Sequence, residues 1–261
     1  MKLAASDYDG TLFRRGEVSR EDLEAIAAWR EKGHLFGLAT GRDLNMTRGE
    51  IIDRKIPVDF IVCNTGASIY EADFTPIHMV GLPPSAAAEV LNHPASRGSR
   101  YLLLSRAGKT YINKWSSDSW LSGLGLELIQ IEEPEVRRMN GLLQLGLEYD
   151  TPDEALRSAD HFNRDFGRYI KAHHSGICVD LVAAGVDKGE GLALLMELKG
   201  WEPEEVLTIG DSGNDLSMLS RYKGHAIANS PDEVIGASQA VVPSVMDMLA
   251  AASTSPENGG K

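Results

Sequence analysis

Short apolar runs and amphipathic segments alternate along the first 66 residues. Three runs have the length and composition of buried strands, and the two segments between them repeat apolar residues at helical spacing. Ser19 and Asp22 stand at the spacing of a capping box, and Gly33 follows the first helical segment. In chain order we expect strand 2–6, helix 19–32, strand 34–39, helix 43–55 and strand 60–63. This alternation predicts a parallel sheet with ligand sites at the carboxyl ends of its strands.

Residues 83–183 follow a different pattern. Strand-like segments flank Ala107-Gly108 and again Ser175-Gly176, and each pair predicts a hairpin. A helical segment with proline in its first turn lies between these hairpins. We expect strands at 101–106, 109–115, 140–149, 169–173 and 177–182 and a helix at 152–166. Hairpins with flanking helices indicate an antiparallel sheet, so the middle of the chain predicts a separate α+β unit.

The strand and helix alternation returns at residue 187. We expect helix 188–199, strand 206–209, helix 214–222, strand 225–228, helix 232–237, strand 241–242 and a final helix. The chain therefore predicts an α/β core of residues 1–82 and 184–252, split by an inserted unit of residues 83–183. Residues 253–261 are polar and glycine-rich, and we expect a flexible tail there.

Charge and composition limit the possible partners. The 261 residues carry a net charge of −12, and no run rich in Lys or Arg occurs, which disfavours nucleic acid and anionic membranes. Residues 97–171 hold 11 Lys and Arg against 11 Asp and Glu, so this neutral middle suits an anionic ligand better than the acidic remainder does. Without a signal peptide or a long apolar run we expect a cytoplasmic protein, with Cys63 and Cys178 as buried free thiols.

Two acids follow the first predicted strand. Asp7 and Asp9 are separated by one residue and are followed by Gly10 and Thr11. If the extended conformation continues to Asp9, both carboxylates lie on one face of the strand. Two close acids repel each other, and a divalent cation relieves that repulsion. Taken alone, these residues are equally compatible with an Asp-Tyr-Asp-Gly turn that ends the strand.

Two further clusters suit a phosphate group. Thr40, Gly41 and Arg42 end a predicted strand, where one hydroxyl and two backbone N–H groups can surround phosphate oxygens. Lys188 begins a predicted helix, where its charge opposes the helix dipole, so a nearby anion would explain it. Taken alone, a structural Thr-Gly turn and a solvated lysine remain the simpler interpretations.

The last cluster is Gly210-Asp211-Ser-Gly-Asn214-Asp215, with one acid at a strand end and another a helical turn later. In this order, the four clusters resemble the four motifs of the haloacid dehalogenase superfamily. The insert between the second and third resembles the type IIB cap of the Cof-like sugar-phosphate phosphatases. The resemblance implies an α/β fold, with a Rossmann-like parallel-sheet core and an inserted α+β cap. It also implies a Mg²⁺-dependent phosphatase of small phosphorylated metabolites, in particular sugar phosphates.

The resemblance also implies a role for each motif residue. Asp7 would attack phosphorus and form an aspartyl phosphate, while Asp9 would protonate the leaving oxygen and then activate water. Thr11 would help to orient Asp9. The carboxylates of Asp7 and Asp211 and the backbone carbonyl of Asp9 would hold Mg²⁺, and Asp215 would support its water ligands. The residues that contact the substrate or its phosphate would be Thr11, Thr40, Gly41, Arg42, Lys188 and Asn214.

Some positions are less defined by the resemblance. Tyr8 stands where Leu or Phe is common, and we expect it to pack with little bearing on the chemistry. Thr65 is an insertion in the usual Asn-Gly-Ala turn, which leaves the shape of that loop open. The cap should close over the leaving group through polar or aromatic side chains, although each candidate is more often a surface or packing residue. The candidates are Lys114, Trp115, Trp120, Lys171, His173 and His174.

Three alternatives to a phosphatase remain to be weighed. A phosphomutase would return the phosphoryl group from Asp7 to a sugar before water could react with it. A phospho-accepting signalling domain would keep a stable aspartyl phosphate, but such domains are much shorter and have no cap. A non-catalytic phosphate-binding protein would require a missing motif residue, and every motif residue is present.

Overall fold

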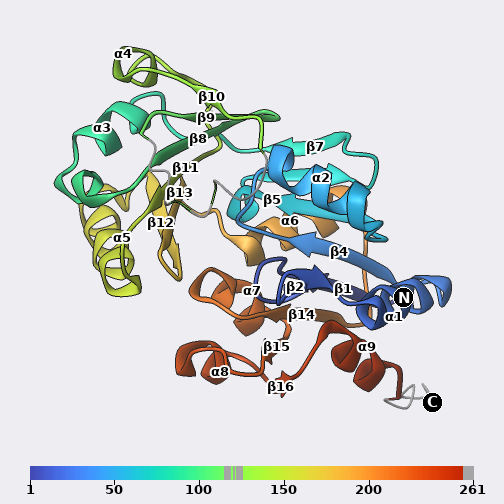
Figure 1. The fold of residues 1–261 in the computed structure, drawn as a ribbon. Coiled ribbons are helices and arrows are strands. Elements are labelled where there is room, and N and C mark those ends of the chain that lie inside the picture. Colours follow the sequence, from blue (N-terminus) through green and yellow to red (C-terminus); the bar gives the residue numbers. More distant parts are fainter. Residues whose placement is uncertain (115–118, 120, 122–125, 255–261) are drawn as a thin grey trace.

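The computed structural model describes residues 1–114, 119, 121 and 126–254, and these residues form two main sheets (Figure 1). The larger sheet, called the core sheet here, has eight strands in the order β16-β15-β14-β1-β4-β5-β6-β7. Neighbours from β16 to β5 run parallel, and β6 and β7 continue antiparallel. The strands are β1 (Leu3–Ser6), β4 (Leu35–Ala39), β5 (Phe60–Cys63), β6 (Ser68–Glu71), β7 (Pro76–Met79), β14 (Val206–Gly210), β15 (Lys223–Ile227) and β16 (Ala240–Val242).

Helices cover both faces of the core sheet. Alternate residues of β1 divide between the two faces: Ala4 packs on the side of α1, α2 and α9, whereas Leu3 and Ala5 pack on the side of α6, α7 and α8. Both faces are therefore apolar, as a parallel sheet requires. The helices are α1 (Arg20–Glu31), α2 (Leu44–Arg54), α6 (Lys188–Lys199), α7 (Leu216–Arg221), α8 (Asp232–Ala237) and α9 (Val245–Thr254), with short 3₁₀ turns η1 (Asn64–Gly66) and η4 (Gly213–Asp215).

The start of α1 links the two ends of the chain. Ser19 caps the helix by accepting the backbone N–H of Asp22 at 3.1 Å, as its spacing predicts. The buried Asp22 carboxylate forms an ion pair with Arg14 at 2.7 Å and accepts the backbone N–H of Met246 in α9 at 2.8 Å. The Ser19–Asp22 pair therefore begins one helix and fastens the last one to it.

The second sheet, called the cap sheet here, has six strands in the order β10-β9-β8-β11-β13-β12. All its neighbours are antiparallel except β9 and β10. Helices α3 and α5 and one face of the sheet share an apolar cluster, so the other face is left to meet the core. The elements are α3 (Ala86–Asn92), η2 (Pro94–Gly98), β8 (Leu102–Arg106), β9 (Lys109–Ile112), β10 (Ile129–Gln130), α4 (Glu133–Val136), β11 (Gln144–Glu148), α5 (Pro152–Phe166), β12 (Ile170–Ser175) and β13 (Cys178–Ala183).

The α/β fold class with an inserted α+β unit is confirmed, and both predicted hairpins form. Several details differ. The helix expected at 214–222 is a 3₁₀ turn followed by α7, and the β6–β7 hairpin and the small hairpin of β2 (Phe13–Arg14) and β3 (Glu17–Val18) were not predicted. The expected tail begins too early, because α9 continues to residue 254; residues 255–261 lie outside the described residues.

Within the described residues, helices long and apolar enough to cross a bilayer are absent. Both cysteines are free thiols, as expected. Cys63 is buried, whereas Cys178 is only partly buried, so the expectation of full burial was wrong for Cys178.

Candidate active site

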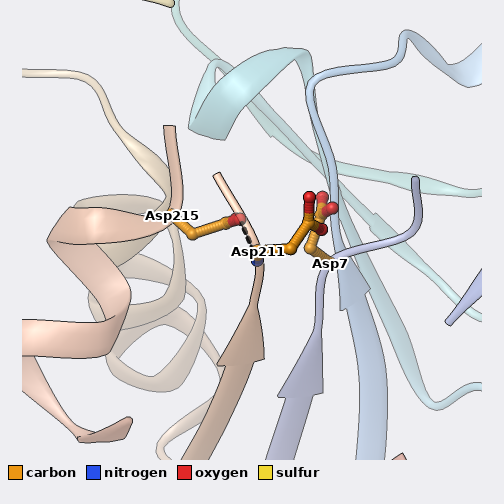
Figure 2. A group of neighbouring side chains, drawn as sticks. All are labelled: Asp7, Asp211 and Asp215. Carbon is orange, nitrogen blue, oxygen red and sulfur yellow. Dashed lines mark hydrogen bonds between the residues drawn. The ribbon is translucent and has the colours of Figure 1, made fainter. Parts of the chain in front are cut away.

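Three neighbouring strands of the core sheet end beside one another. Asp7 follows β1, Thr40 follows β4 and Asp211 follows β14, and β1 pairs with both of the other strands. Because neighbouring parallel strands end at the same edge of a sheet, the loops that follow them converge. Figure 2 shows the carboxylates of Asp7 and Asp211 turned toward each other above these strand ends. The structure thus brings together the sequence motifs at which we expected chemistry.

Lys188 lies beneath this edge with its side chain fully buried. Its ammonium group donates to Oδ1 of Asp7 at 2.6 Å, to Oδ1 of Asp215 at 2.6 Å and to Oδ1 of Asn214 at 3.2 Å. Burial opposes the charge of Lys188, but the carboxylates of Asp215 and Asp7 outweigh burial and raise the pKa of the ammonium group. The anions that explain a lysine at the start of α6 are therefore these two carboxylates.

Three acids form a compact group of oxygen donors. Asp7, Asp211 and Asp215 each offer one carboxylate oxygen, and these oxygens lie within 4.8 Å of one another. The second oxygen of Asp215, Oδ2, accepts the backbone N–H groups of Asp211 at 2.9 Å and Ser212 at 3.0 Å, the first of which is dashed in Figure 2. Burial raises the pKa of Asp7 well above its ordinary range and, with the nearby Asp215 charge, raises that of Asp211 to about 6. Crowded, hard oxygen donors of this kind fit Mg²⁺.

Thr11 does not make the contact that we expected. The sequence interpretation assigned it to orienting Asp9, but its hydroxyl donates to Oδ1 of Asp211. A hydroxyl has a single proton, so this donor is committed to Asp211 and the group of three acids. Gly10 allows the close approach, because a β-carbon at this position would lie 2.5 Å from Asp211 and its φ is +78°.

Arg42 also differs from expectation, since its side chain binds Asp9. Nε donates to Oδ2 of Asp9 and Nη2 to Oδ1, both at 2.7 Å, which is a bidentate ion pair. The third nitrogen, Nη1, donates to Glu50 at 3.3 Å, and the guanidinium lies 4.9 Å from the ring centre of Tyr8. The Tyr8 hydroxyl donates to Glu50 at 2.6 Å, so Tyr8 belongs to the structure that holds Asp9 and is more than a packing residue. The backbone N–H of Arg42 donates to Thr40 Oγ1 at 3.1 Å.

A chamber of about 470 Å³ lies between the two sheets, above these residues. Its core side includes Asp7, Asp9, Gly41, Asp211 and Asn214. Most of its cap side is built from alternate residues of three strands, whose neighbours face the apolar cluster beneath α5. These alternate residues are Leu103 and Ser105 of β8, Gln144 and Gly146 of β11, and Cys178 and Asp180 of β13.

Direct contacts join the cap side to the core side. Gln144 donates to the carbonyl of Gly41 at 3.0 Å, and Asn64 donates to Ser105 at 2.9 Å and to Gln144 at 3.1 Å. The cap lies so close to residue 41 that only glycine fits there, because a β-carbon at this position would lie 2.9 Å from Oδ2 of Asp180. The cap is therefore seated on the loop that follows β4.

Comparison with known proteins identifies the family. A family model described as haloacid dehalogenase-like hydrolase matches residues 4–249, which is most of the chain. The chain belongs to the haloacid dehalogenase-like hydrolases. The resemblance drawn from the sequence motifs is thereby confirmed, and the protein is an enzyme of this hydrolase family.

Named relatives of this hydrolase are phosphatases. The chain is 25% identical to the HMP-PP phosphatase of Citrobacter koseri, over 90% of this chain and 86% of the relative. It is also 25% identical to the 5-amino-6-(5-phospho-D-ribitylamino)uracil phosphatase YcsE of Bacillus subtilis, with the same coverage. Among solved structures, the subclass IIB sugar phosphatase BT4131 superposes with a TM-score of 0.77 at 20% identity, over 95% of each chain. This last likeness shows a shared fold, with the cap included.

The cap residues that we proposed from the sequence of this hydrolase do not line the chamber, as far as the described residues go. Lys114 donates to backbone carbonyls of η2 and the following residue, and Lys171 is exposed. His173 contacts the carbonyl of Val186 at 3.1 Å, and His174 lies 3.7 Å from Glu233. Trp115 and Trp120 lie outside the described residues.

The sequence interpretation missed the polar residues that do line or support the chamber of this hydrolase: Asn64, Ser105, Gln144 and Asp180. One signal was available. Asp180 is a lone acid inside an otherwise apolar strand, and an acid at such a position needs a reason. The other three are small or neutral residues whose position depends on how the cap meets the core.

Proposed function

We propose that this haloacid dehalogenase-like phosphatase depends on Mg²⁺ and hydrolyses small phosphorylated metabolites, sugar phosphates above all, through an aspartyl phosphate on Asp7. The observation that carries the proposal is the buried ammonium of Lys188, which holds Asp7 and Asp215 at 2.6 Å while Asp211 lies within 4.8 Å of both carboxylates. A nucleophile, a fixed positive charge and a metal-binding group thus share one edge of the sheet.

The two half-reactions use Asp7 and Asp9 in turn. In the first, a carboxylate oxygen of Asp7 bonds to phosphorus as the bond to the leaving oxygen breaks, and Asp9 gives that oxygen a proton. In the second, Asp9 takes a proton from water, the water oxygen bonds to phosphorus, and the bond to Asp7 breaks. Inorganic phosphate leaves, and both aspartates return to their starting state.

The residues present fit a bound magnesium ion. Asp7, Asp211 and the backbone carbonyl of Asp9 would hold it, and Asp215 would support its water ligands. When bound, the ion supplies positive charge that lets an anionic phosphate approach the Asp7 carboxylate. The chain itself aligns these donors: Thr11 fixes Asp211, and Lys188 fixes Asp7 and Asp215.

The phosphoryl group would be held by Thr40, Gly41, Lys188 and Asn214, where fixed donors stabilise the charge that develops on its oxygens. Arg42 would instead hold Asp9 through the bidentate pair in the carboxylate state, in which Asp9 takes the proton from water, and one of the two bonds would be given up when Asp9 carries the proton. This role differs from the phosphate contact expected from the sequence motif of Arg42. The cap would comprise residues 83–183 and the core residues 1–82 and 184–252, which agrees with the strands that enter each sheet.

Release of inorganic phosphate tests the proposal. The substrates are glucose 6-phosphate, fructose 6-phosphate, ribose 5-phosphate and p-nitrophenyl phosphate, each with Mg²⁺ and with EDTA. We expect release that requires Mg²⁺ and that Asp7→Asn abolishes, while the exposed Asp160→Asn variant retains it. Release that survives in Asp7→Asn would contradict the role of Asp7. Conversion of one hexose phosphate into an isomer, without free phosphate, would favour a phosphomutase.

A further inference from the structure

The chamber has two chemically different halves. The core half holds Gly41 and Asn214, which we assign to the phosphate, and Asp7, Asp9 and Asp211, which we assign to Mg²⁺. The cap half offers hydrogen-bonding groups and an apolar wall, and a single carboxylate, that of Asp180, among its described residues. The hydrogen-bonding groups of the cap half include Ser105, Gln144 and Ser175, and its apolar wall includes Leu103 and Ile177.

Positive charge is scarce throughout this chamber. Among the described residues that line it, Arg42 is the sole cation, against the acids Asp7, Asp9, Asp43, Asp180 and Asp211. All three guanidinium nitrogens of Arg42 already face carboxylates of Asp9 and Glu50. Residues 115–125, which are only partly described, contain no Lys, Arg or His in their sequence, so no side chain of this segment can carry a positive charge.

The nearest other cation is Lys188, which lies behind the core half, where its buried ammonium donates to Asp7 and Asp215. Other cations lie outside the chamber. Arg14 and Arg15 line a second depression, which shares only Asp9 and Gly10 with the chamber. Arg14 is also paired with Asp22 at 2.7 Å. The neutral charge balance of residues 97–171 therefore does not describe the surface that faces the substrate, because the basic residues of the cap lie outside the chamber.

Asp180 stands at the boundary between the two halves. Its Oδ2 lies 3.4 Å from the hydroxyl of Thr65 and 2.9 Å from the position of a β-carbon on Gly41, the loop that we assign to the phosphate. A substrate that extends from this loop into the cap half has to pass the Asp180 carboxylate. A hydroxyl or ammonium group on the leaving group can donate to Asp180, whereas a second phosphate or a carboxylate meets a like charge.

We propose that the chamber selects phosphomonoesters whose leaving group is uncharged or cationic, and that Asp180 is the residue that rejects a second anionic group. The inference rests on the phosphatase function proposed above. It separates monophosphates of sugars and amino sugars, which fit, from bisphosphates, pyrophosphates and phosphorylated sugar acids, which do not.

The test compares substrates that differ mainly in charge: glucosamine 6-phosphate, glucose 6-phosphate and 6-phosphogluconate, together with fructose 6-phosphate and fructose 1,6-bisphosphate. We expect kcat/KM for each anionic member to be at least about tenfold below that of its uncharged partner. Asp180→Asn keeps the shape of the side chain and removes its charge. The ratio of kcat/KM between each uncharged substrate and its anionic partner should therefore become several-fold smaller in this variant. Asp160→Asn makes the same charge change on the exposed surface of α5 and should leave the ratio unaltered.

Binding to Asp7→Asn, measured by calorimetry in Mg²⁺ with the same five compounds, separates this inference from the proposed function. If wild-type protein releases no phosphate but the variant still binds uncharged members more tightly, the proposed hydrolysis fails and the selectivity stands. If anionic members are hydrolysed or bound as well as their partners, the selectivity is wrong even though the phosphatase stands. An unchanged ratio in Asp180→Asn would remove Asp180 as its cause.

Discussion

Asp180 should lower the stability of the folded protein at neutral pH. Burial raises the pKa of its carboxyl from the ordinary value of 3.8 to about 6, although hydrogen bonds from Gln144 and Thr65 and the charge of Lys188 act against burial. A partly buried carboxylate that costs free energy is characteristic of a residue retained for function. Asp180→Asn removes the charge and retains the shape, so we expect this variant to be more stable than the wild type at pH 7.

The pH dependence of this effect has a defined sign. Well below pH 3.8 the carboxyl is protonated in both the folded and unfolded states, so the wild type bears no penalty there. As the pH rises through the interval from 3.8 to about 6, the unfolded state releases its proton first, and the wild type loses stability relative to the variant. A shift of about two pKa units corresponds to about 3 kcal/mol above pH 6, and this is an upper bound because water still reaches part of the side chain.

Urea unfolding measures the difference directly. The free energies of unfolding of wild type and Asp180→Asn are compared at several pH values between 4 and 8 in EDTA. Acids elsewhere titrate equally in both proteins and cancel in the difference. The exposed Asp160→Asn variant controls for net charge and should differ from wild type by less than about 0.5 kcal/mol. A variant that is no more stable at pH 7, or whose advantage grows as the pH falls, would refute the argument.

Three further changes test other parts of the site. Lys188→Ala leaves buried carboxylates without their counter-charge. We expect kcat/KM for phosphate release to fall by at least about 100-fold and the free energy of unfolding in urea to fall by about 3–5 kcal/mol. A normal kcat/KM would exclude a role of Lys188 in the reaction. Tyr8→Phe removes only the hydroxyl that donates to Glu50, so kcat should fall by about fivefold with KM unchanged, and an unaltered kcat would return Tyr8 to a packing role. Iodoacetamide should modify Cys178 and spare Cys63, because Cys63 is buried and burial raises the pKa of its thiol. Phosphate with Mg²⁺ should slow the alkylation of Cys178, which peptide mass mapping would follow. Equal rates of alkylation with and without phosphate would contradict the position of Cys178 in the chamber.

The convergence of the motif residues could be foreseen because it depends on local pattern and on one topological rule. Asp7, Thr40 and Asp211 each follow an apolar run, and parallel strands bring such positions to one edge. Lys188 was placed beside them only by the resemblance of its motif to the family, because its position at the start of a helix, taken alone, favoured a solvated lysine. The burial of Lys188 and its three partners could not be foreseen, since they depend on the depth to which α6 packs against β5 and η1.

The partners of the remaining site residues were beyond the sequence pattern. Arg42 precedes a helix, and its side chain could equally have turned toward a phosphate or toward an acid. In the structure Glu50 of α2 accepts from Nη1 of Arg42, which favours the orientation that pairs Arg42 with Asp9. Thr11 was expected to contact Asp9, two residues before it, and instead reaches Asp211, 200 residues later. Side-chain choices of this kind depend on contacts between distant segments, which local spacing does not encode.

The chemistry of the chamber follows from strand register in the cap. In the pairing of β11 with β13, Gly146 lies opposite Asp180 and Leu145 lies opposite Leu181. The leucines enter the apolar cluster beneath α5, so Gly146 and Asp180 must face the core. A slip of one residue in β13 would bury the Asp180 charge in that cluster and turn Leu181 into the chamber. The burial of Leu145 and Leu181 in the apolar cluster of the cap therefore also determines that Asp180 faces the chamber. Because Gly146 has no side chain, room remains beside Asp180 for the leaving group.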